Sequence, residues 1–504
     1  MLPLMPSFAP LRKALILTLC AALPLMAAEP KAASQTNELT LRECIARALD
    51  KNFNLKLQSY DSANALESLA LSQSDFDPNF TLTTSKSVNQ ADVATTTLTG
   101  TRSENLSTRI GVSQKISTGA TVNLSSSLDR SATNNTFATL NPAYDADVTL
   151  SISQPLLKNA GSTVNRAAIE RAEIGLEIAN LNYRGRVLQL VSDTESAYYN
   201  LVFAREQLKV RKSSFELAEK LYSENKTRKN TGVATDLDVL QAEVGVETAR
   251  RNVLLAEQAV SNAEDGLLNL IGQFEFDSTL GEVSMSMSNN FAPSFDVSYQ
   301  LARDNQPDYL AASNALKQLE IDVAAAKRNR LPSLDLGGAV GYNSRDSSAS
   351  SAIDRLPNGD GYAWQVDLSL KIPWGMRSEK ARYNTALNYL RRQETRVRQI
   401  EQDLTVQVRS AVRSVETNQA SVEISHKATE LSAKQYELEK ARFDAGLSTS
   451  RRVLEAQDDL ETARVAELQA RVNLRTAAAE LQRLDGSSLA YYNISLDDQM
   501  VSAK

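Results

Sequence analysis

The sequence is short of the residues from which most active sites and metal centres are built. Its 504 residues include two cysteines and one histidine. These are Cys20, Cys44 and His426, too few for a disulfide framework or for a metal site of His and Cys ligands. The chain also has no Gly-Lys phosphate loop and no nucleophile elbow. We therefore predict no catalytic, cofactor or metal site and no enzymatic activity.

Long apolar runs and aromatic residues are scarce as well. Aromatic residues make up 6% of the chain, and the mean hydropathy is −0.32. After residue 29 no apolar run reaches the length of a membrane-spanning helix, which excludes a polytopic helical membrane protein. The 55 basic and 61 acidic residues give a net charge of −6, which argues against nucleic acid as a partner. Any membrane crossing would have to use β-strands.

The first 28 residues have the pattern of a secretory signal peptide. Arg12-Lys13 precede an apolar run, and the small residues Ala27-Ala28 offer a cleavage site. The segment around Cys20 resembles a lipobox, but Leu19 stands where that motif requires a small residue. We therefore expect no lipid on Cys20, and we expect an exported chain in which Cys44 is the one thiol.

The chain repeats itself, which predicts two copies of one structural unit. Residues 214 positions apart match around the predicted turns, and a spacing of 254 relates Pro78 to Pro332. The matched residues include Tyr222, Gly232 and Thr235, which recur as Tyr436, Gly446 and Thr449. We expect repeat 1 at 29–276, an irregular connector at 277–294, repeat 2 at 295–486 and a tail at 487–504.

Each repeat is predicted to run in the order helix, strands, helical hairpin. A proline ends the first helix, and a glycine ends the hairpin as a C-cap. The predicted ranges are helix 39–74, strands within 78–154 and hairpin 164–271 in repeat 1, then helix 295–330, strands within 333–372 and hairpin 376–484 in repeat 2. Repeat 1 offers four strands, with a hairpin at 106–130 around Ser117-Thr118-Gly119, and repeat 2 offers two.

The long helices carry a narrow apolar seam rather than a broad core face. Leucines and aromatic residues recur every seven positions at Leu201, Leu208, Phe215 and Tyr222, as in a coiled coil. The residues between them are mostly polar. From the helices alone, a secreted or periplasmic coiled-coil structural protein with a small β-sandwich stays open as an alternative.

The predicted strands favour a channel over the coiled-coil structural protein. They alternate apolar residues with small polar ones, and several reach the 9–11 residues that a tilted strand needs to cross a bilayer. Closing even a small barrel takes about eight strands, more than one chain supplies. Either the strands pair face to face, or several chains share one barrel.

Several motifs resemble the TolC family of outer-membrane efflux proteins. They are the duplicated plan, the exits Gln154-Pro155-Leu156 and Ile372-Pro373-Trp374, and the turn Arg442-Phe443-Asp444-Ala445-Gly446 followed by Val453-Leu454-Glu455-Ala456-Gln457. The resemblance implies a mainly α fold with a β-barrel portion. Long antiparallel helical hairpins would form a periplasmic α-barrel, and the strands of three chains would share a transmembrane β-barrel in the bacterial outer membrane.

The same resemblance implies the function and the partners. The protein would be a homotrimeric, passive exit duct for efflux or type I secretion, docked by a periplasmic adaptor and an inner-membrane pump. The family supplies two strands per repeat, hence twelve per trimer. We expect twelve spanning strands here, and whether the extra hairpin at 106–130 enlarges the barrel or folds as a surface flap stays open.

The hairpin turns are the predicted periplasmic tip, where the tunnel narrows in the family. Gly232 and Gly446 permit turn conformations that a β-carbon disfavours. The candidate gate residues beyond these glycines differ in charge between the repeats: Asp236, Asp238, Arg451, Arg452 and Glu455. Our hypothesis is that an aspartate of one hairpin pairs with an arginine of the neighbouring one and holds the tip shut. The alternative for Asp236 is ordinary helix-start chemistry.

Overall fold

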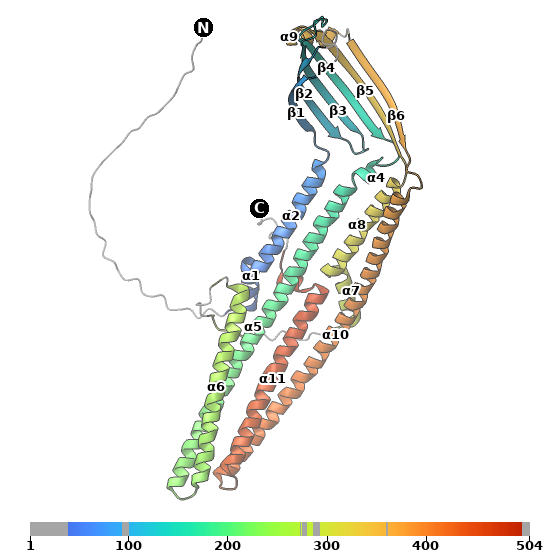
Figure 1. Cartoon of the computed structure of the whole chain (residues 1–504). Helices are drawn as coiled ribbons and strands as arrows, with labels where there is room; N and C mark the ends of the chain where they lie inside the picture. The colour runs from blue at the N-terminus through green and yellow to red at the C-terminus, as the bar shows by residue number, and fades with distance from the viewer. Residues whose placement is uncertain are drawn as a thin grey trace, which may run out of the picture.

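The computed structural model describes residues 39–92, 100–272, 274, 280–285, 293–358 and 361–495. The predicted signal peptide at 1–28, Cys20 and parts of the connector and tail lie outside the described residues. The molecule is elongated, with a curved sheet at one end and two helical hairpins at the other (Figure 1). Among the described helices, none is both long enough and apolar enough to cross a membrane.

The helices predicted at 39–74 and 295–330 are each broken in two, so the prediction of continuous helices was wrong. The breaks lie at Asn52 and Gln306, which are equivalent residues of the two repeats. Each side-chain oxygen accepts hydrogen bonds from the backbone N–H groups two and three residues further on, the geometry of a helix N-cap. Pro307 then occupies the first helical position, where its missing N–H costs nothing. The resulting helices are α1 Leu41–Lys51, α2 Phe53–Ser74, α7 Phe295–Asn305 and α8 Pro307–Asn329.

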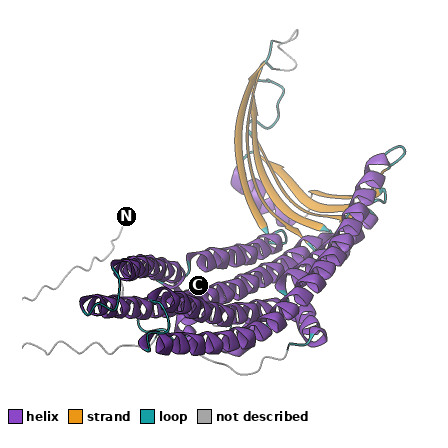
Figure 2. Ribbon diagram, turned by 90° about the horizontal axis from the view of Figure 1, so that it is seen from below, coloured by secondary structure: helices purple, strands orange, loops and turns teal. Residues whose placement is uncertain are grey.

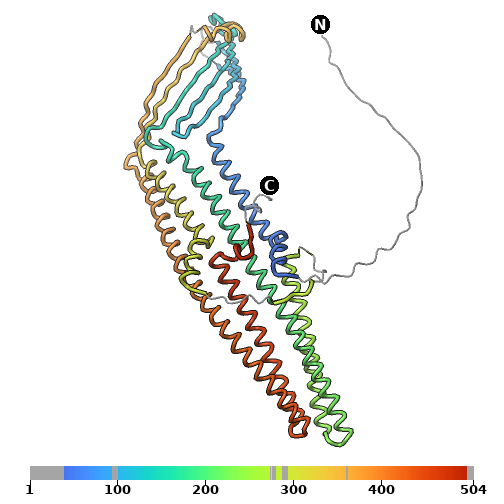
Figure 3. The backbone as a smooth tube through the Cα atoms, turned by 180° about the vertical axis from the view of Figure 1, so that it is seen from behind, coloured from blue at the N-terminus to red at the C-terminus, as the bar shows by residue number. Residues whose placement is uncertain are grey.

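Two long helical hairpins form the opposite end of the molecule. The first consists of α5 Ala167–Asn230 and α6 Asp236–Ile271, and the second of α10 Arg377–Asp444 and α11 Ser450–Asp485. They lie side by side in the order α6, α5, α11, α10 (Figure 3). The short helices α4 Ser162–Asn165 and α12 Ser488–Tyr492 flank the hairpins.

The core is a thin seam along α5 and α10. Leu188 and Leu201 of α5 are buried against α1 and α6, while Val408 and Val415 of α10 form a second cluster with α7 and α11. Cys44 is buried in the first cluster. Burial raises the pKa of its thiol to about 12, so Cys44 is a packing residue and not a reactive one.

The six strands of the described residues form one antiparallel sheet in sequence order. They are β1 Asn79–Gln90, β2 Arg102–Lys115, β3 Thr121–Thr133, β4 Ala143–Pro155, β5 Ser333–Asp346 and β6 Gly361–Lys371, with α9 Ala349–Arg355 and η1 Leu356–Asn358 between the last two. The sheet is curved along its strands (Figure 2). The extra hairpin is thus an integral pair, β2 and β3, between β1 and β4. The expected twelve spanning strands per trimer correspond to four strands per chain, and the described sheet of one chain has six. The number that spans the membrane stays a prediction.

Candidate functional site

The sheet has one apolar and one polar face. Register aligns one residue from each strand into rows that cross the whole sheet. One row is apolar throughout and consists of Phe80, Val112, Leu124, Leu150, Val340 and Trp364. The adjacent row is small or polar and consists of Thr81, Gly111, Ser125, Thr149, Gly341 and Ala363. Such a sheet suits lipid on one side and water on the other.

The polar face also carries charged side chains. Arg345 of β5 pairs with Asp145 of β4, its Nη2 lying 2.9 Å from Oδ2. The hydroxyl of Ser127 on β3 donates to Asp147 on β4. Charge pairs of this kind between neighbouring strands are typical of a wall that lines water.

At the other end of the molecule, both hairpin turns have the same backbone geometry. Gly232 and Gly446 have φ angles of 73° and 76°. The N–H of Val233 donates to the carbonyl of Arg228 at 2.9 Å, and that of Leu447 to the carbonyl of Arg442 at 2.8 Å. These bonds form Schellman caps, which require a left-handed residue at the glycine position. The two tips are therefore equivalent turns.

The turn glycine predicts a measurable strain. Replacing Gly232 by alanine forces a β-carbon into the left-handed region and should lower the stability by about 1 kcal/mol. The matched control is Gly266→Ala inside α6, where a β-carbon meets nothing within 4 Å and should stabilise by roughly 0.5–1 kcal/mol. Thermal melting of the two purified variants should shift in opposite directions. Equal shifts would contradict the role given to Gly232.

The structure places each predicted tip residue within its own hairpin. Asp238 and Thr235 form a capping box, and the hydrogen bonds from Thr235 lower the pKa of Asp238. Asp236 pairs with Lys229. Arg451 Nε lies 2.8 Å from Glu455 Oε1.

The N–H of Arg452 donates to the carbonyl of Thr449 at 3.1 Å as α11 begins. Within the described residues of one chain, no Asp–Arg pair of the hypothesis forms. A pair between neighbouring chains stays a prediction.

Close to the tip, Arg228 joins the two hairpins, a contact that the sequence reasoning missed. Its guanidinium lies 4.0 Å from the centroid of the Phe443 ring. Nη1 donates to the Phe443 carbonyl at 3.2 Å, and Nη2 lies 3.7 Å from Asp444 Oδ1. The signal was present, because Arg228 and Arg442 stand at equivalent positions four residues before the turn glycines. Repeat 1 has Lys229 and Asn230 at the positions that correspond to Phe443 and Asp444 of repeat 2.

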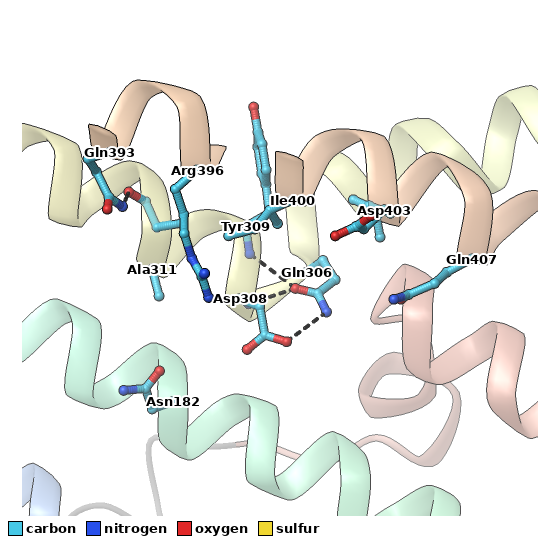
Figure 4. Close-up of a pocket in the computed structure, with 12 residues that line it drawn as sticks. Asn182, Gln306, Asp308, Tyr309, Ala311, Gln393, Arg396, Ile400, Asp403 and Gln407 are labelled. Carbon is cyan, nitrogen blue, oxygen red and sulfur yellow. Dashed lines mark hydrogen bonds between the residues drawn. The ribbon is translucent and has the colours of Figure 1, made fainter. Parts of the chain in front are cut away.

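A polar cavity of about 470 Å³ lies where α8 begins, between α5 and α10 (Figure 4). Gln306, whose side chain caps α8, is one of the residues that line it. The lining includes Asn182, Asp308, Arg396 and Asp403. Small-molecule sites are mostly apolar with a few polar groups, so this lining does not favour a site for hydrophobic cargo.

Comparison with known proteins decides the family. The profile of the family described as "Outer membrane efflux protein" matches residues 120–273 and 298–487, which is most of the chain. The chain belongs to the outer membrane efflux protein family. The predicted TolC-type family and the predicted outer-membrane location are thereby confirmed.

Curated members of the outer membrane efflux protein family align at moderate identity. "Toxin and drug export protein A" of Aggregatibacter actinomycetemcomitans is 24% identical over 326 residues, covering 61% of this chain and 65% of that relative. "Protein CyaE" of Bordetella pertussis is 29% identical over 328 residues, covering 64% and 67%. The alignment thus spans just under two thirds of the first relative's length.

Solved structures of the family share the fold. The Campylobacter jejuni CmeC outer membrane channel has a TM-score of 0.66 at 19% identity, covering 88% of this chain and 85% of that one. VceC of Vibrio cholerae has a TM-score of 0.66 at 15% identity, covering 88% and 96%. This likeness confirms the predicted fold class, long helical hairpins with a β-barrel portion.

Proposed function

We propose that the chain is one subunit of a homotrimeric outer-membrane duct that passively conducts substrates delivered by a periplasmic adaptor and an inner-membrane pump. The observation that carries the proposal is that, within the described residues, both lateral edges of the chain expose surfaces that could pair with another copy. The terminal strands β1 and β6 each have one neighbour. The outer helices α6 and α10 of the hairpins expose apolar stripes. A cyclic arrangement of copies completes both edges at once.

The two helical stripes match in height above the tip. Leu240 follows Gly232 by eight residues, and Leu438 precedes Gly446 by eight. Leu254 follows Gly232 by 22 residues, and Ile424 precedes Gly446 by 22. Because every helical residue rises by about 1.5 Å, these side chains lie at equal distances from the turns. The exposed stripes are Leu237, Leu240, Val244, Leu254 and Leu255 on α6, and Ile424, Leu431 and Leu438 on α10.

The internal repeat points to the same partner. In repeat 2, α8 and α11 each pack against both long helices, α5 and α10. Their counterparts in repeat 1, α2 and α6, pack against α5 and leave the opposite face open. If the two repeats have equivalent neighbours in the assembly, the open face of α2 and α6 packs against α10 of a second copy. Charged residues of both signs flank the two stripes, among them Glu243 and Arg251 on α6 and Lys427 and Glu430 on α10.

The cargo is set by the pump in this proposal. The relatives' names cover toxin and drug export as well as cation efflux. The polar cavity at Gln306 is not matched to one cargo, and a shared duct behind different pumps explains both name groups. We infer no catalytic step in the duct itself.

The tip is the proposed gate. Arg228 ties the two hairpins of one chain together through Phe443 and Asp444. At the equivalent contact between two chains, Arg442 of one copy would face Lys229 and Asn230 of the next. These two residues have neither the aromatic ring nor the carboxylate that Arg228 contacts within one chain. We place opening at the seams between chains, where Asp236 or Asp238 of one copy faces Arg451 or Arg452 of the next, with Glu455 beside them.

Reversing one charge tests the gate. Arg452→Glu should raise the single-channel conductance in planar bilayers above wild type, because it replaces attraction by repulsion at three symmetric seams. Each exposed pair contributes only about 0–1 kcal/mol, so the variant should still assemble. Arg398→Glu is the control, since Arg398 is exposed on α10 and lies 48 residues before Gly446. Unchanged conductance for Arg452→Glu would remove this residue from the gate.

Fractionation tests the function as a whole. The protein should be found in outer membranes, migrate as a trimer after mild detergent extraction, and form ion-conducting channels in planar bilayers. Recovery as a monomer from the soluble extract would instead favour a coiled-coil structural protein.

A further inference from the structure

We propose that three copies close a β-barrel of eighteen strands, in which β6 of each copy pairs with β1 of the next. This inference rests on the trimer proposed above and specifies its membrane portion. The described part of each chain has six strands, and three chains give that number. Twelve strands would require the β2–β3 hairpin to leave the sheet.

The direction of the edge strands permits closure. β1 begins at Asn79, just after α2, and β6 ends at Lys371, just before α10. The two edges of one chain therefore run in opposite directions. When a second copy is placed beside the first, its β1 lies antiparallel to β6, like every other pair in the sheet. Closure also removes the free edges, which are otherwise sites of aggregation.

The extra hairpin continues the lipid-facing surface without a gap. Val112 and Leu124 are the β2 and β3 members of the apolar row that begins at Phe80 and ends at Trp364. Their sequence neighbours Gly111 and Ser125 belong to the polar row on the opposite face. A flap outside the wall has no reason to keep this register with both neighbouring strands. The hairpin therefore has an apolar face and a polar face, as the wall of a membrane barrel requires.

The turn of the hairpin is attached to the helical end of the sheet. The N–H of Gly161 donates to the carbonyl of Thr118 at 2.9 Å, and the Thr118 hydroxyl donates to Gln154 Oε1 at 3.1 Å. Gly119 has a φ of 94°, and a β-carbon there would meet the Asn159 carbonyl at 2.6 Å. The turn thus packs on the segment between β4 and α5 and is held in place where the wall meets the tunnel.

A wider membrane portion follows from the strand number. Barrel diameter grows roughly linearly with the number of strands, so eighteen strands give a barrel about 1.5 times as wide as twelve. Barrels of 16–18 strands leave an aqueous channel in their interior. The hairpin adds two strands per chain and no helix, because β2 and β3 connect to each other through a turn. The size limit of the duct then lies in the helical portion and not in the membrane.

Site-directed spin labelling tests whether the hairpin is part of the wall. Leu124→Cys and Ser125→Cys, adjacent on β3, would carry nitroxide labels in trimers reconstituted into liposomes. Leu150→Cys on β4 is the lipid-facing reference, and unsubstituted protein is the blank because Cys44 is buried. We expect the label at 124 to match that at 150, with several-fold greater relaxation by oxygen than by a water-soluble nickel chelate. The label at 125 should show the reverse.

The strand count itself is the second measurement. An electron cryo-microscopy map of the detergent-extracted protein should show eighteen strands around the barrel. A trimer with twelve strands, or water accessibility at both 124 and 125, would overturn this inference and leave the trimeric duct standing. A monomer would overturn the proposed function itself.

Discussion

Replacing Glu195 by glutamine is expected to stabilise the protein at pH 8 by about 3 kcal/mol per chain and to reduce the loss of stability that accompanies a rise in pH from 5 to 8. Glu195 lies on α5 and is 4% exposed. Burial raises the pKa of its carboxyl group to about 7, against the opposing effects of a hydrogen bond with Tyr492 and the charge of Arg475. A carboxyl group with a pKa of about 7 instead of 4.5 loses about 3 kcal/mol of folding stability when it is fully ionised, at about 1.36 kcal/mol per tenfold change in the proton-binding constant.

The direction of the pH effect follows from proton binding. Below pH 4.5 the carboxyl group is protonated in both the folded and the unfolded chain, so burial carries no ionisation penalty. Between pH 4.5 and 7 the unfolded chain releases the proton while the folded chain retains it, and the free energy of unfolding falls as pH rises. Above pH 7 the full penalty persists. Glutamine keeps a hydrogen-bonding group for Tyr492 and has no charge to bury.

Thermal melting followed by circular dichroism between pH 5 and 8 measures this difference. The control is Glu206→Gln on the same helix, where an exposed carboxylate pairs with Lys209 at 2.7 Å. Its effect should stay within about 0.5 kcal/mol. A Glu195→Gln variant that melts like wild type at pH 8 would show that the buried carboxyl group is not the cause of the pH dependence.

The helical hairpins were predictable from the sequence because their ends depend on local chemistry. Gly232 and Gly446 mark the Schellman caps, and α6 begins with the capping box of Thr235. Such signals act over four to six residues and need no tertiary partner. The breaks at Asn52 and Gln306 were missed because the apolar pattern continues through them. Pro307 was visible as a break signal, since proline is tolerated at the first turn of a helix but not inside one.

The sheet and the tip show where sequence reasoning stops. Alternation along β2 and β3 predicts which residues share a face, but it does not identify the neighbouring strand. Their pairing with β1 and β4 is a tertiary property. At the tip, the charges of the residues suggested pairs between the two hairpins. In the structure Asp236 pairs with Lys229, and Arg451 pairs with Glu455, both of which are nearby in the sequence. The contact between Arg228 and Phe443 joins residues 215 positions apart, which no local pattern predicts.

Introducing a carboxylate into the stripe on α10 should abolish the trimer. Leu431 is 60% exposed in the single chain, and in the proposed assembly it packs against α6 of the next copy. Burying one leucine contributes about 1.5–3 kcal/mol. Leu431→Asp loses this contribution and adds a charge to an apolar seam, where Glu243 and Glu247 of the partner helix would lie close. Because a cyclic trimer repeats the contact three times, the penalty is incurred at every seam.

Size-exclusion chromatography with light scattering, after mild detergent extraction, should therefore find Leu431→Asp as a monomer and wild type as a trimer. Leu431→Met is the matched control, since it keeps an apolar side chain of similar volume and should assemble. Val244→Asp on α6 should reproduce the loss from the opposite side of the seam. If the exposed stripes were only the wet flanks of a coiled coil, neither aspartate would change the oligomeric state. Trimeric Leu431→Asp and Val244→Asp would thus assign the subunit contacts to the sheet edges alone, because β6 and β1 would then hold the three copies together without help from the helices.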